Sequence, residues 1–101
     1  MEKYIIVAHP IDFTRKALSL YLKSVGFIPY ELEPDDDIEF KAMDMEPVAL
    51  IIYDTFEHQD KSNSAIIDAF STRTYEISGK IDPFKLVGQI KQEVETSRSL
   101  D

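Results

Sequence analysis

An apolar run from Val48 to Tyr53, closed by Asp54, is the feature of this chain that most constrains its fold. A short run rich in β-branched residues is typical of a strand buried on both faces, and such strands belong to parallel sheets that are covered by helices. Asp54 stands at the carboxyl end of the predicted strand, where open α/β sheets place their binding sites. The run therefore predicts an α/β fold and makes Asp54 the first candidate site residue.

Strand and helix patterns alternate along the rest of the chain. Strands are predicted over residues 3–8, 27–32, 48–54 and 74–78, and helices over residues 13–25, 36–45, 63–70 and 83–95. We expect one stripe of the first helix to face the sheet, formed by Phe13, Ala17, Leu18, Tyr21, Leu22 and Val25. Asp12 is its expected N-cap and Gly26 its expected stop.

Four strand–helix units with short connections predict a doubly wound parallel sheet of about four strands. The first strand would be central. The second would lie at an edge, because Pro29 within it cannot donate a hydrogen bond to a neighbouring strand. We expect one domain over residues 1–95 and a frayed tail over residues 96–101.

Composition narrows the possible partners and compartments. The net charge is −8, from 19 acidic and 11 basic residues, and the basic residues are scattered, so we expect no nucleic-acid binding. The chain has no cysteine, which excludes disulfides and thiol catalysis. It shows neither a signal-peptide pattern nor an apolar stretch of about 20 residues, so we expect a cytoplasmic protein without membrane association.

Three segments carry a resemblance to a known family. They are Lys3-Tyr-Ile-Ile-Val with the segment from Phe13 to Phe27, the strand from Val48 to Asp54, and the turn Ile77-Ser-Gly-Lys-Ile-Asp-Pro-Phe-Lys-Leu. In this order and spacing they resemble the receiver domains of two-component response regulators, the CheY-like domains, which have a flavodoxin-like fold. Only 25 residues separate Asp54 from Lys80, which leaves the chain about one βα unit shorter than a full receiver.

The resemblance implies a phosphate site in which several positions are altered. Asp54 matches the phosphoacceptor, and Lys80 and Ser78 lie near the phosphate. Ala8 and His9 stand where the family has an acidic pair that binds Mg²⁺. Mg²⁺ requires hard oxygen ligands, and phosphoryl transfer needs cationic stabilisation. We therefore expect no Mg²⁺ or other cofactor. With no nucleophile motif and only 3 glycines, we also expect no enzymatic activity.

These observations predict a stand-alone, degenerate receiver-like protein that acts as a phosphorylation-independent protein–protein interaction module in bacterial signal transduction. A homodimer is a further possibility, because losing a βα unit exposes an edge or an apolar patch. Two alternatives remain open. The first is a genuine phospho-accepting regulator that uses Asp54. The second is a small-molecule or metal binder, for Zn²⁺ or another transition metal, in a crevice formed by Asp54, His9 and His58.

Two surface features are further candidates for partner contacts. The acidic run from Glu31 to Glu39 is best explained as a solvated strand edge and helix start, and the alternative is a patch that steers a basic partner. Candidate exposed aromatic side chains are Tyr53, Phe56 and Phe84.

Overall fold

The computed structural model describes residues 3–70, 72–79 and 81–99. Its elements, in chain order, are β1 (Tyr4–Ala8), α1 (Asp12–Ser24), β2 (Ile28–Glu31), α2 (Ile38–Met45), β3 (Ala49–Tyr53), β4 (Glu57–His58), β5 (Lys61–Ser62), α3 (Asn63–Ala69), β6 (Arg73–Ile77) and α4 (Pro83–Ser99). The final helix thus runs to Ser99, past its predicted end at residue 95.

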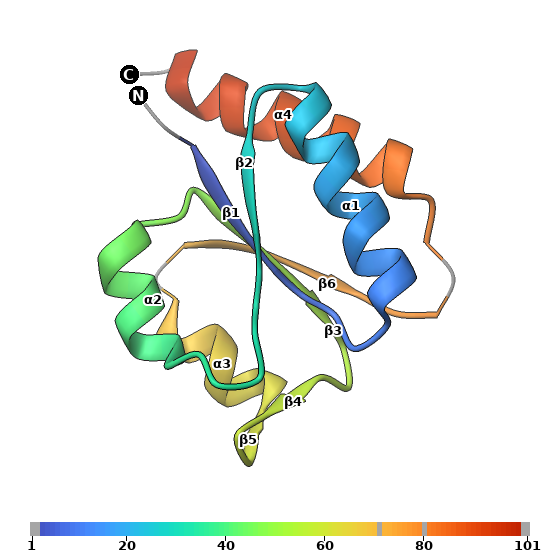
Figure 1. Ribbon diagram of the computed structural model, residues 1–101. Coiled ribbons are helices and arrows are strands. Elements are labelled where there is room, and N and C mark those ends of the chain that lie inside the picture. Colours follow the sequence, from blue (N-terminus) through green and yellow to red (C-terminus); the bar gives the residue numbers. More distant parts are fainter. Residues whose placement is uncertain (1–2, 71, 80, 100–101) are drawn as a thin grey trace.

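The main sheet has four parallel strands in the order β2-β1-β3-β6. Helices α1 and α4 cover one face, and α2 and α3 cover the other (Figure 1). The doubly wound parallel fold predicted from the sequence is confirmed, with β1 inside the sheet and β2 at an edge. No helix in the described part of the chain is long and apolar enough to cross a membrane.

The alternation of side chains along each strand builds two separate cores. Ile5 and Val7 point toward α1 and α4, whereas Ile6 and Ala8 point toward α2 and α3. The first core is completed from the helices by Leu18, Leu22, Val87, Ile90 and Val94. The second is completed by Ile38, Phe56, Ile66 and Phe70. The two faces of the sheet therefore carry different side chains to its carboxyl edge.

The residues at the two ends of α1 match their predicted roles only in part. Gly26 adopts φ +96° just after α1, a conformation that glycine tolerates and that ends the helix. The prediction for Asp12 is wrong, because Ile11 occupies the N-cap position and Asp12 is the first helical residue, paired with Arg15. Residues 55–62, which lie between the predicted strand 48–54 and the predicted helix 63–70, contain the β4–β5 hairpin.

The expected inward stripe of α1 is also wrong in part. Leu18 and Leu22 are fully buried, but Phe13 is 83% exposed and Tyr21 also faces solvent. With 3.6 residues per turn, Phe13 and Leu18 lie about 140° apart around the helix, too far for both to reach one sheet face. Leu20, which is 68% exposed, falls on the same side as Phe13. Helix α1 therefore carries a second apolar face, which is turned to solvent.

Candidate functional site

Asp54 lies at the carboxyl edge of the sheet, directly after β3. Its backbone N–H donates a hydrogen bond of 2.8 Å to the carbonyl of Ile77, which joins the ends of β3 and β6. Its side chain is exposed. Ser78 is exposed after β6, and Lys80 lies outside the described residues. The edge thus presents a solvated carboxylate, held in place through its backbone.

His9 follows β1 at the same edge, and its ring is buried at 3% exposure. Its Nδ1 accepts a hydrogen bond from the Ile11 N–H at 3.1 Å, which assigns the proton of the neutral ring to Nε2. The ring packs edge-on against Tyr53, with centroids 4.8 Å apart. Burial lowers the pKa of the His9 imidazole below its ordinary value, and the positive charge of the nearby Arg15 guanidinium lowers this pKa further. His9 is therefore neutral at physiological pH, and Ala8 beside it is fully buried.

Arg15 is a cation at this strand end, and contacts within the fold hold it in place. Its Nη1 donates to the His9 carbonyl at 2.8 Å, and its Nε donates to a carboxylate oxygen of Glu31 at 2.9 Å. It also pairs with Asp12. These contacts tie α1 to the end of β1 and to the edge strand β2, so the guanidinium has a structural role.

His58 does not join His9. Its Nε2 donates to the backbone carbonyl of Asp36 at 2.9 Å, and its buried ring stacks on Phe56 on the side of α2 and α3. His9, by contrast, lines a cavity walled by α1 and the start of α4. Among the described residues, no three His, Asp or Glu side chains are grouped to hold a metal ion. The expected crevice of two imidazoles and Asp54 is not formed, because the two rings belong to opposite faces of the sheet.

The cavity beside His9 has a volume of about 360 Å³. Its inner wall is formed by His9 and Tyr53, and its outer rim by Ile11, Phe13 and Ile81. Thr14 and Gly79 also line it, so its surface is mainly apolar with a few polar groups. It opens at the carboxyl ends of the strands, the usual position for a site in an α/β fold.

Next to this cavity, α1 and α4 both carry exposed apolar side chains. Tyr21 and Phe84 meet edge-on, with ring centroids 5.9 Å apart, above a hollow of about 100 Å³ that Gly88 also lines. Phe84 is 69% exposed. We define the α1/α4 face as Ile11, Phe13, Leu20, Tyr21 and Phe84, all of which are exposed.

Of the three aromatic candidates, only Phe84 has an exposed side chain. Phe56 is buried in the core, and Tyr53 is half-buried against His9. Phe13 and Tyr21, which the sequence pattern predicts to face the sheet, are exposed instead. The sign that could have revealed them is the width of the apolar arc of α1, which exceeds what one sheet face can cover.

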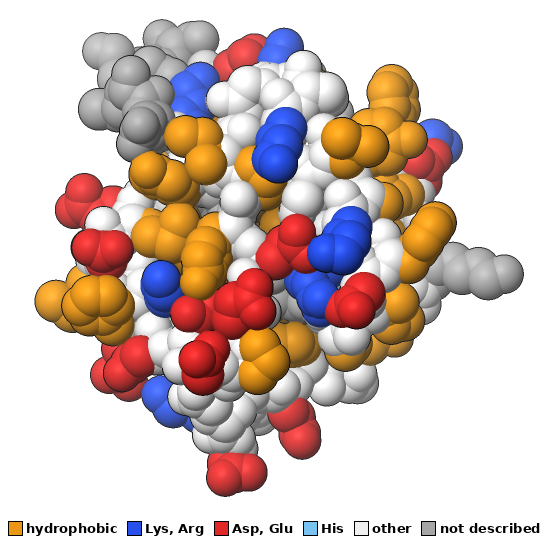
Figure 2. Space-filling view, viewed as in Figure 1, with side chains coloured by type: hydrophobic (Ala, Val, Ile, Leu, Met, Phe, Trp, Pro, Cys, Tyr) orange, Lys and Arg blue, Asp and Glu red, His pale blue; other side chains and the backbone are white. Residues whose placement is uncertain are grey.

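Acidic side chains gather over α2 and the loop before it, whereas basic and acidic side chains lie together over α1 (Figure 2). Several acids of the run from Glu31 to Glu39 support the fold. Asp36 accepts hydrogen bonds from the Tyr30 hydroxyl and the Glu33 N–H, each 2.7 Å long. Asp37 caps α2 by accepting the N–H of Phe40. The run is therefore a structured helix start as well as a charged surface.

No protein-family model matches the chain, and no curated protein matches it.

Proposed function

We propose that this protein is a phosphorylation-independent interaction module that binds a partner protein through its α1/α4 face. The exposure of Phe13, Leu20 and Phe84 on one surface is the observation that carries the proposal. Contiguous exposed apolar surface is unfavourable in water, and its usual role is recognition of a partner. Aromatic side chains are also the residues most enriched at interaction hot spots.

Independence from phosphorylation is supported by the side chains around Asp54. The two positions that match the metal-binding acids of receivers hold a buried alanine and a buried, neutral histidine. Neither supplies an oxygen ligand for Mg²⁺. On the resemblance alone, we assign the module to bacterial signal transduction, where it acts without catalysis of its own.

The first test compares partner retention by variants. Tagged wild-type protein and variants are used to isolate bound proteins from cells of the source organism. We expect Phe13→Ser with Phe84→Ser to lose the partner and Asp54→Asn to retain it. Ile28→Thr, which changes an exposed apolar residue on β2, is the matched control. Loss of the partner on Asp54→Asn, or retention on the double substitution, would overturn the proposal.

The second test addresses phosphate chemistry directly. A ¹H–¹⁵N NMR titration with Mg²⁺ and then beryllofluoride, a mimic of an aspartyl phosphate, should leave the amides of Asp54, His9 and Ser78 unshifted. Saturable shifts centred on these three amides would establish the phospho-accepting alternative.

A second candidate function is binding of a small ligand in the cavity beside His9. Its volume of about 360 Å³ and its position at the carboxyl edge favour this use. Calorimetric titrations with Zn²⁺, Mg²⁺ and nucleotides test it, and flat titrations with all three would count against these ligands.

A further inference from the structure

We infer that the α1/α4 face binds the α2 surface of a second copy of this chain, so that copies associate head to tail. This inference rests on the proposed function and names the partner of the same face. It comes from a second exposed apolar surface, which lies on the opposite side of the sheet.

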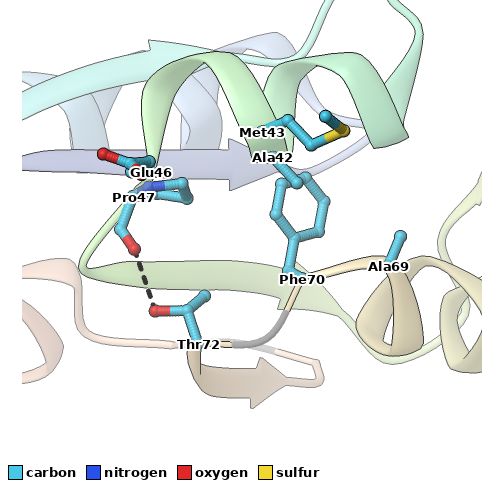
Figure 3. Close-up of a pocket in the computed structure, with 7 residues that line it drawn as sticks. All are labelled: Ala42, Met43, Glu46, Pro47, Ala69, Phe70 and Thr72. Atoms are coloured by element: carbon cyan, nitrogen blue, oxygen red, sulfur yellow. Dashed lines mark hydrogen bonds between the residues drawn. The ribbon is translucent and has the colours of Figure 1, made fainter.

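Helix α2 carries that second surface. Phe40 is 60% exposed and Met43 is 80% exposed, and their i,i+3 spacing places them side by side on the helix. A cavity of about 300 Å³ opens beside Met43. Figure 3 shows it between α2, which contributes Ala42 and Met43, and the end of α3, where Ala69 and Phe70 lie. A projecting aromatic side chain such as Phe84 suits this mainly apolar hollow.

The two surfaces differ in their balance of charge, and only the α2 surface is strongly acidic. Eleven of the 19 acidic residues of the chain, but only two of its 11 basic residues, lie between Glu33 and Asp68. Exposed Glu39, Asp44 and Glu46 surround the α2 surface, and Glu46 lines its cavity. The α1/α4 face is bordered by three exposed lysines, Lys16, Lys23 and Lys85, and by two exposed acids, Asp12 and Asp82. Electrostatic complementarity of this kind steers association and selects the partner surface.

A symmetric contact of two α1/α4 faces is less favourable, because it would bring the lysines of one copy near those of the other. A contact between α1/α4 and α2 pairs unlike charges and buries both apolar surfaces. Since the sheet separates α1 and α4 from α2 (Figure 1), a copy that uses one surface keeps the other open. Such a heterologous contact extends into chains or rings.

The test measures mass in solution by sedimentation equilibrium and light scattering. Wild type should form species larger than a dimer as its concentration rises. Raising NaCl from about 50 to 500 mM should weaken this association by about ten-fold, because surface charges are screened at high salt. Two blocked variants are made, Phe13→Ser with Phe84→Ser and Phe40→Ser with Met43→Ser. Each should remain a monomer of 11.6 kDa.

Mixing the two blocked variants is the decisive step. Each retains one intact surface, so an equal mixture should form a dimer of twice the monomer mass and stop there. Circular dichroism of each variant confirms folding, and Ile28→Thr should assemble as wild type does.

Three results would overturn the inference. They are a wild type that stays monomeric at about 1 mM, an α2 variant that still dimerises alone, and a mixture that stays monomeric. If the α1/α4 variant nevertheless loses its cellular partner, the proposed function stands and only its assignment to a second copy fails. If partner retention is unaffected, the proposed function itself fails.

Discussion

Replacing Gly88 by alanine should stabilise this protein. Gly88 lies within α4, is exposed, and has no heavy atom within 4 Å of the position that a Cβ would take. Alanine in a helix interior is more stable than glycine by about 0.5–1 kcal/mol, because glycine loses more backbone entropy on folding. For a domain of this size that gain raises Tm by about 2–8 °C.

Gly26→Ala is the matched control. Gly26 also has open space around its Cβ position, but its φ is +96°, which an L side chain rarely adopts. We expect this variant to lose about 1–2 kcal/mol. Thermal unfolding by circular dichroism, supported by urea titration at 25 °C, measures both. A lower Tm for Gly88→Ala, or the same sign of change in both variants, would refute the reasoning.

Gly88 also lines the hollow beneath Tyr21 and Phe84, so the same variant reports on binding. Packing within the chain does not require a glycine there, because the added methyl meets nothing. A glycine at position 88 would instead be required where the backbone of a partner approaches α4 closely. We therefore expect Gly88→Ala to raise Tm while it weakens association at the α1/α4 face. Unchanged association would remove this role for Gly88.

Three further variants test the contacts that hold the carboxyl edge and α4. The pKa of His9 is lowered in the fold, so as pH drops below 6.5 the unfolded chain binds a proton that the folded chain does not. The free energy of unfolding should therefore fall over this range. His9→Gln should lack this part of the decline in urea titrations from about pH 7 to 5. Burial and the 2.8 Å hydrogen bond to Glu93 raise the pKa of Tyr75 to about 12 from 10.0, so stability should fall as pH rises through that interval. Tyr75→Phe should flatten this alkaline decline, and an unchanged slope would contradict the assignment. Arg15→Met removes the hydrogen bonds to the His9 carbonyl and to Glu31 and should cost about 2 kcal/mol at neutral pH. A loss below about 0.5 kcal/mol would show that these bonds are largely replaced by water.

The sheet was predictable because its signals are local. The run from Val48 to Tyr53 is too apolar for any position except a strand covered on both sides, and Pro29 excludes β2 from the interior of the sheet. Each signal depends on one segment and on backbone chemistry. The β4–β5 hairpin was missed because its residues are polar. Its turn also requires positive φ at Gln59 and Asp60, and this pair is not the Asn-Gly or Asp-Gly sequence that identifies such a turn.

The candidate surfaces were predicted less well because they depend on several segments at once. Helical spacing predicts Phe13 in the core, but the apolar arc of α1 is wider than one sheet face, and only the packing shows which part of it is buried. His58 looked like a neighbour of His9, but the hairpin turns it toward Asp36 on the other face. Asp12 looked like a helix cap until the backbone placed Ile11 at the cap position.

By itself, the sequence determined the α/β class, the order of the main elements, the charge and the position of Asp54 at a strand end. Those properties follow from backbone preferences and from the apolar content of single segments. Tertiary structure alone decided that His9 is buried and neutral, that His58 lies away from it, and that α1 turns aromatic side chains to solvent. Burial and proximity are set by how the layers pack, and residues distant in the chain share a surface only once the sheet has brought their helices together.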